Sequence, residues 1–123
     1  MKHTLFILTA LALAACGTAE KPVAAAEQVA ADAASAAYAT CVDKEAALVD
    51  LAADQPAALT DRAMKACRDA RAEVVTKVTV AQVAAGKDAA TAASVAEQSV
   101  RVADSELRSR ANTAIVTRKL KAN

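Results

Sequence analysis

The chain has 123 residues, with 15 lysines and arginines against 14 aspartates and glutamates, and a net charge of +1. This length suits one small domain, and the nearly balanced charge gives no global attraction to nucleic acid. Apolar residues make up 55% of the chain, but most are alanines. Because alanine buries little area, such a chain needs long helices, a disulfide or a partner to be stable.

The N-terminal stretch, Met1–Gly17, has the features of a secretory signal. Lys2 and His3 give it a positive start, and an apolar run follows over residues 4–12. This run is far shorter than the ~20 residues that span a bilayer, which favours a signal over a transmembrane helix.

Leu13, Ala14, Ala15 and Cys16 follow the apolar run. A leucine and two small residues before a cysteine resemble the lipobox of bacterial lipoproteins. The resemblance implies cleavage between Ala15 and Cys16, transfer of a diacylglyceryl group to the Cys16 sulfur, and acylation of the new amino terminus by a fatty acid such as palmitate. Gly17 stands where an aspartate would favour inner-membrane retention. The resemblance therefore implies anchoring on the periplasmic face of the outer membrane of a Gram-negative cell.

These features predict a signal peptide over 1–15, a lipidated cysteine and tether over 16–22, and a single helical domain over 23–123. The alternatives are an ordinary secretory signal in which Cys16 occurs by chance, or a buried apolar strand. Loss of the signal removes His3, the only histidine, and with it any histidine-based triad or metal site. The two glycines also leave no glycine-rich phosphate loop. We expect no enzyme activity, no catalytic residue, no metal and no cofactor.

Pro56 and Gly86 divide the remaining chain into three alanine-rich segments that lack internal glycine and proline, so helix is the default state of each. We predict an all-α fold with helices over about 24–53, 57–85 and 88–120. The first two helices would form a long antiparallel hairpin. The third long helix would complete a three-helix bundle or an elongated coiled coil.

The first segment carries apolar residues at steps of three and four, which mark one face of a helix: Tyr38, Cys41, Val42, Leu48, Val49 and Ala52. The alanine-rich stretch before it, residues 24–37, has little to bury and could form a stalk. Pro56 suits the first position of the second helix, with Asp54 or Gln55 as its cap.

The second segment contains a β-branched run, Val74–Val80, that could form a strand. No second strand-like run exists to pair with it, so we predict helix. Gly86 is predicted to cap the end of this helix, and Asp88 to cap the start of the third. The alternative is one very long helix that Gly86 only interrupts.

Cys41 and Cys67 remain once Cys16 is assigned to lipid. An even pair in an exported chain predicts a disulfide, and the midpoint of the pair, residue 54, falls in the predicted turn. Residues equidistant from the turn of an antiparallel hairpin lie at the same height. The pair lacks the C-x-x-C arrangement of redox-active cysteines, so we expect a structural bridge, with Tyr38 packed over it. The Tyr38-x-x-Cys41 helix, the proline turn and the Cys67 helix resemble small alanine-rich exported proteins of proteobacteria, a resemblance that implies no function.

Charged residues offer few other sites. The carboxylate pairs Asp43/Glu45, Asp50/Asp54 and Asp104/Glu106 are interpreted as solvated helix faces. The last twenty residues carry a net charge of +3, which could contact anionic lipid or a partner, or could complement the helix dipole. The cations concerned are Arg108, Arg110, Arg118, Lys119 and Lys121.

We therefore expect a lipid-anchored, non-enzymatic protein with an envelope-structural or interaction role, bound to the membrane through its anchor and to a protein partner in the envelope. One alternative is a small disulfide-stapled inhibitor or binding module for an envelope protein. A second is a self-associating coiled-coil lipoprotein, because the apolar seams over 74–83 and 95–107 exceed what a slim hairpin can cover.

Overall fold

The computed structural model describes residues 22–122, which form the helices α1 (Pro22–Leu48), α2 (Pro56–Ala66), α3 (Arg68–Ala84) and α4 (Ala89–Ala122). No strand occurs among these residues, so the all-α prediction is confirmed for this part of the chain. The predicted signal peptide and the lipidated Cys16 lie outside the described residues.

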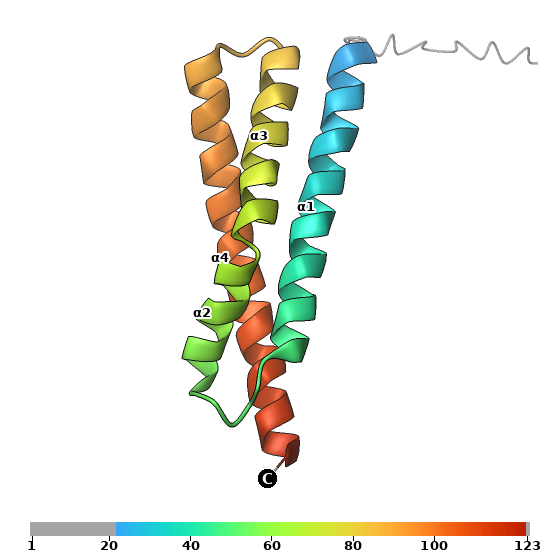
Figure 1. Cartoon of the computed structure of the whole chain (residues 1–123). Coiled ribbons are helices and arrows are strands. Elements are labelled where there is room, and N and C mark those ends of the chain that lie inside the picture. The colour runs from blue at the N-terminus through green and yellow to red at the C-terminus, as the bar shows by residue number, and fades with distance from the viewer. Residues whose placement is uncertain (1–21, 123) are drawn as a thin grey trace, which may run out of the picture.

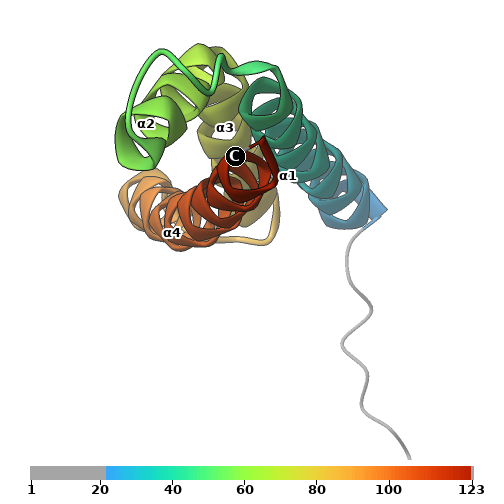
Figure 2. The same ribbon diagram turned by 90° about the horizontal axis from the view of Figure 1, so that it is seen from below.

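The helices form an elongated bundle with a clear direction (Figure 1). The helices α1 and α4 run the same way along it, and α2 and α3 run the opposite way. α1 packs mainly along α3, which also packs along the first half of α4, while α2 packs against the second half of α4 (Figure 2). The start of α1 and the α3–α4 turn therefore lie at one end of the bundle, and the C-terminus lies at the other.

One core joins all four helices, and its larger side chains lie in the middle and C-terminal parts of the bundle. It consists of Tyr38, Val42, Ala46, Leu59, Ala63, Cys67, Val74, Val100, Leu107, Ala111 and Ile115. Toward the other end the buried residues are alanines, including Ala24 and Ala31 of α1. The stretch that could have formed a stalk is thus packed into the bundle, because alanines let neighbouring helices approach closely.

The first helix ends at Leu48, five residues before the predicted end. Two acidic side chains bond to the backbone beyond it: Asp50 Oδ1 accepts from the Ala52 N–H at 3.0 Å, and Asp54 Oδ1 accepts from the Gln55 N–H at 2.8 Å. Such local bonds offer the backbone an alternative to helix. Pro56 then begins α2 as predicted, although Gln55, at the capping position, makes no side-chain capping bond.

The prediction of a single helix over 57–85 is wrong. The helix is interrupted at Cys67, and the segment forms α2 and α3 instead. Cys67 has φ −98° and ψ 17°, and its N–H donates to the Met64 carbonyl at 3.2 Å. Cys67 is bonded to Cys41 with a Cα–Cα distance of 5.9 Å, within the usual range for a disulfide. The interruption between α2 and α3 therefore falls at the residue that carries the bridge. The β-branched run Val74–Val80 lies within α3 and is helical, as predicted.

The turn between α3 and α4 confirms both predicted caps. Gly86 has φ +97°, which an L side chain rarely adopts, and its N–H donates to the Val83 carbonyl at 2.9 Å. The Lys87 N–H donates to the Gln82 carbonyl at 3.1 Å, which completes a Schellman motif. Asp88 Oδ1 then accepts from the Thr91 N–H at 3.0 Å. The alternative of one long helix through Gly86 is wrong.

The two apolar seams are largely covered by this bundle. Val74, Val100 and Leu107 are buried, and only Val80, Val83 and Val102 remain strongly exposed within 74–83 and 95–107, at 42%, 46% and 58%.

Candidate functional site

A partly buried polar network joins three helices of the bundle at the level of the disulfide. The Tyr38 ring is buried in the core, with 1% of its surface exposed, and its hydroxyl donates to Asp104 Oδ1 at 2.7 Å. Arg71 Nε donates to Asp104 Oδ2 at 2.8 Å, so one carboxylate of α4 receives bonds from α1 and α3. Arg71 also reaches Glu97 at 3.7 Å. Asp104 is therefore a structural partner rather than the solvated carboxylate that its sequence context suggests.

The network shifts the pKa values of two of its members. Burial, and then the hydrogen bond to Asp104, raises the pKa of Tyr38 well above its ordinary value of 10.0. The hydrogen bond to Asp104 raises the pKa of Arg71, against the opposing effect of partial burial. Tyr38 thus stays a neutral hydrogen-bond donor and Arg71 a permanent cation across the accessible pH range, and neither is poised as a base.

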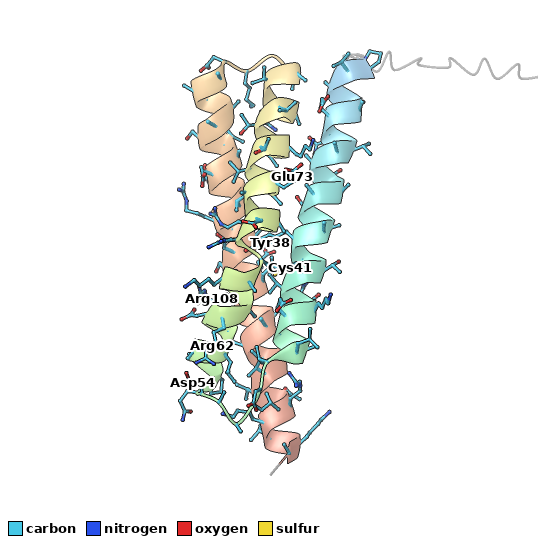
Figure 3. The ribbon with its side chains drawn as sticks, viewed as in Figure 1. Tyr38, Cys41, Asp54, Arg62, Glu73 and Arg108 are labelled. Atoms are coloured by element: carbon cyan, nitrogen blue, oxygen red, sulfur yellow. A yellow bond between two sulfur atoms is a disulfide. The ribbon has the colours of Figure 1, made fainter. Side chains whose placement is uncertain are left out.

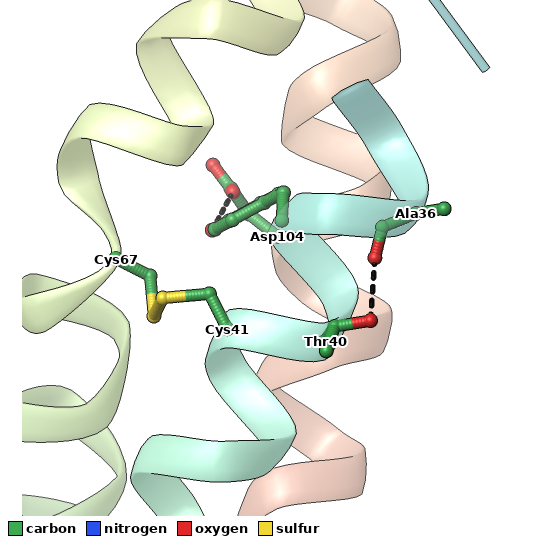
Figure 4. The surroundings of a disulfide bond; sticks show 6 residues. Ala36, Thr40, Cys41, Cys67 and Asp104 are labelled. Atoms are coloured by element: carbon green, nitrogen blue, oxygen red, sulfur yellow. Dashed lines mark hydrogen bonds between the residues drawn. A yellow bond between two sulfur atoms is a disulfide. The ribbon is translucent and has the colours of Figure 1, made fainter. Parts of the chain in front are cut away.

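The predicted disulfide between Cys41 and Cys67 is present and lies one helical turn from Tyr38 (Figures 3 and 4). Cys67 is buried, with 1% of its surface exposed, and belongs to the same core as the Tyr38 ring. Asp104, which accepts the hydrogen bond from Tyr38, lies near the bridge (Figure 4). The bridge and the network together fix the heights of α1, α3 and α4 relative to one another.

A groove opens beside this network, between the α2–α3 junction and α4. Its volume is about 490 Å³, and we call it the junction groove. Its lining consists of Tyr38, Asp61, Met64, Lys65, Arg68, Arg71, Asp104 and Arg108. Four of these side chains are cationic and two are acidic, so the lining has a net formal charge of +2.

A smaller hollow of about 320 Å³ continues the junction groove along α2 and α4. It shares Asp61 and Arg108, which form an ion pair between the two helices. Its other polar lining is neutral and is made of Thr60, Ser105, Ser109 and Asn112. The surface between α2 and α4 therefore passes from a cationic part to a part rich in hydroxyl and amide groups.

The five C-terminal cations predicted as possible partner or lipid contacts are spread along the second half of α4. Most bond within the molecule: Arg108 to Asp61, Arg110 to Asp43 at 2.9 Å, Arg118 to the Ala46 carbonyl at 2.7 Å and Lys119 to the Asp54 carbonyl at 2.6 Å. Lys121 is exposed. Arg108 is the one among them that lines the junction groove. Ala15 and Cys16, the predicted cleavage and lipidation residues, lie outside the described residues.

Sequence reasoning missed the cations on the α2–α3 side of the junction groove. Lys65, Arg68 and Arg71 follow one another at steps of three, which places them on one side of a continuous helix. That spacing was a usable signal. The acidic partners on α4 gave no local signal, because Asp104 lies 33 residues from Arg71 and 66 from Tyr38 in the chain.

Within residues 22–122, no group of three or more histidine, cysteine or acidic side chains is placed to hold a metal ion. None of the helices in this range is both long enough and apolar enough to cross a membrane. Comparison of the chain with protein-family models, with curated proteins and with solved structures finds no match.

Proposed function

We propose that this chain is a bacterial lipoprotein: a helical protein anchored through lipid on Cys16 to the periplasmic face of the outer membrane, with a non-enzymatic structural or interaction role. The observation that carries the proposal is the sequence Leu13-Ala14-Ala15-Cys16 directly after a short apolar run. Two or more acyl chains make membrane attachment lasting, where one chain binds only marginally.

The Cys41–Cys67 bridge supports the proposed compartment. Disulfides persist in oxidising environments such as the bacterial periplasm and are rare in the cytosol. The bridge also supplies stability that a core of alanines and a few larger side chains provides only in part. One disulfide therefore adds stability that a small exported domain of this composition needs.

Fatty-acid labelling tests the anchor. We expect cells that express the full chain with radiolabelled palmitate to label the wild type and the Cys41→Ala/Cys67→Ala variant, but not Cys16→Ser. The double variant is the matched control, because it also loses cysteines but keeps the proposed lipid site. Undiminished labelling of Cys16→Ser, or an unlabelled wild type in the soluble fraction, would contradict the proposal.

Residue 17 tests the choice of membrane. We expect the wild type and Gly17→Ser to fractionate with outer membranes on a density gradient, and Gly17→Asp to shift to the inner membrane. An unchanged distribution of Gly17→Asp, or a wild type already in the inner membrane, would overturn the proposed location while leaving the anchor standing.

The junction groove favours a second candidate function, that of a small disulfide-stapled binding module in the envelope. The groove is the place where weakly paired cations, a partly buried polar network and a hollow surface coincide. Crosslinking in cells from a photoreactive residue at position 65 tests this function. A specific adduct that is absent when the photoreactive residue replaces Lys87 would support it, and equal adducts from both sites would count against it.

A further inference from the structure

Two cations on the α2–α3 side of the junction groove have no effective partner. Lys65 is exposed and takes part in no ion pair or side-chain hydrogen bond with the rest of residues 22–122. Arg68 meets only Asp69, at 3.5 Å, and these side chains are 76% and 95% exposed. An ion pair so open to water contributes almost nothing, so both cations are free to receive a ligand.

The other two cations of the groove are paired with carboxylates. Arg71 is held by Asp104 at 2.8 Å in a partly buried pair, and Arg108 forms a more exposed ion pair with Asp61 across the groove. A guanidinium has five N–H donors, and these bonds engage only some of them. The two guanidinium groups, of which that of Arg71 is held in position, lie beside two free cations and form an arrangement complementary to a carboxylate or a phosphate.

The net formal charge of +2 in the groove distinguishes it from its neighbour. The hollow that continues it contains one paired aspartate and one paired arginine, and its remaining polar groups are neutral. The junction groove therefore carries more cations than acidic groups, and a cleft with a net positive charge raises the local concentration of an anion.

We propose that the junction groove is a binding site for an anionic ligand, which places a carboxylate or phosphate group between Lys65, Arg68 and the guanidinium groups of Arg71 and Arg108. This proposal rests on the interaction role proposed above and names the chemistry that the site would recognise. It does not require the lipid anchor, so labelling of Cys16 and ligand binding can fail independently.

Titration with two simple anions tests the site. The full chain, extracted from membranes in a neutral detergent and labelled with ¹⁵N, is titrated separately with inorganic phosphate and with succinate while its NMR spectrum is followed. We expect saturable shifts at millimolar anion that centre on the α2–α3 junction and weaken as sodium chloride is added. Saturation by phosphate alone would assign a phosphate-bearing ligand, and saturation by succinate alone a carboxylate; either supports the proposal.

Matched charge variants make the test specific. We expect Lys65→Gln/Arg68→Gln to weaken binding roughly tenfold, and Lys87→Gln/Arg101→Gln, which removes the same charge elsewhere, to leave it unchanged. Circular dichroism verifies that both variants keep the helical content of the wild type. Shifts that do not saturate with either anion, or an equal loss in the control variant, would overturn the proposal.

Discussion

Tyr38 has two structural roles in this bundle. Its ring fills the core beside Cys67, and its hydroxyl bonds to Asp104 on another helix. The sequence supports the first role, because Tyr38 lies on the apolar face of the first helix. The sequence does not predict the second role, because a hydrogen bond between residues 66 positions apart depends on how the helices pack.

Replacing Tyr38 with phenylalanine isolates the contribution of the hydroxyl. We expect Tyr38→Phe to lower the free energy of unfolding by about 1–2 kcal/mol, because the hydrogen bond to Asp104 Oδ1 is lost while Arg71 still bonds to Oδ2 of the same carboxylate. Urea denaturation at neutral pH measures the loss. Asp69→Ala is the control, since its side chain is 95% exposed and its removal should change stability little.

The same substitution gives a pH signature. The folded-state pKa of Tyr38 is raised above 10.0, so its contribution to stability is complete below that pH and declines as pH rises toward the folded value. We therefore expect the stability difference between wild type and Tyr38→Phe to shrink above pH 10, and tyrosinate absorbance to rise only as the protein unfolds. A normal titration of Tyr38 in the folded protein would show that the hydroxyl is not bonded as described.

At the level of the elements, the local sequence predicts some helix ends correctly and others incorrectly. Pro56 and Gly86 marked the start of α2 and the end of α3 because each has a backbone requirement that can be read residue by residue. Asp50 and Asp54 accept hydrogen bonds from the backbone just after α1, and α1 ends earlier than predicted. Such local bonds and a continued helix are close in free energy, so the sequence does not show where α1 ends. The break at Cys67 had no local signal, since neither glycine nor proline occurs there.

The disulfide should act as one unit. We expect Cys41→Ala and Cys67→Ala each to lower the free energy of unfolding by about 3 kcal/mol, because each opens the same closed loop, whose ends are 26 residues apart. The double variant should be no less stable than the weaker single variant, and reduction of the wild type should cause a similar loss. Urea denaturation measures all four, and losses that add in the double variant would show that the cysteines act separately.

At the level of the whole molecule, the candidate site was harder to predict than the fold. The alanine-rich segments and the paired cysteines indicate helices and a bridge, because these depend on composition and on even spacing about a turn. The junction groove depends on the α2–α3 break and on partners from α4, and Asp61 and Asp104 join it only once the bundle is assembled. The spacing of Lys65, Arg68 and Arg71 groups these three cations in the sequence, but Arg108 joins them only once α4 packs against the junction.

The direction of the bundle predicts how an anchored molecule is oriented. Five residues separate Cys16 from Pro22, so the start of α1 would lie within about 20 Å of the lipid. The other end of the bundle lies farther by the length of α4, about 50 Å for 34 residues. A fluorophore on Lys87→Cys should be quenched by headgroup-labelled lipid more strongly than one on Lys121→Cys. Equal quenching, or the same difference in Cys16→Ser, would contradict this orientation.

The parallel course of α1 and α4 places the described ends of the chain at opposite ends of the bundle, and this restricts symmetry. Copies anchored through Cys16 to one membrane would all point the same way. Two such copies could pair only about a two-fold axis perpendicular to that membrane, because an axis parallel to it would place one anchor on the wrong side. Any self-association on the membrane is thereby limited to contacts between the sides of the bundle, with equal residues at equal heights.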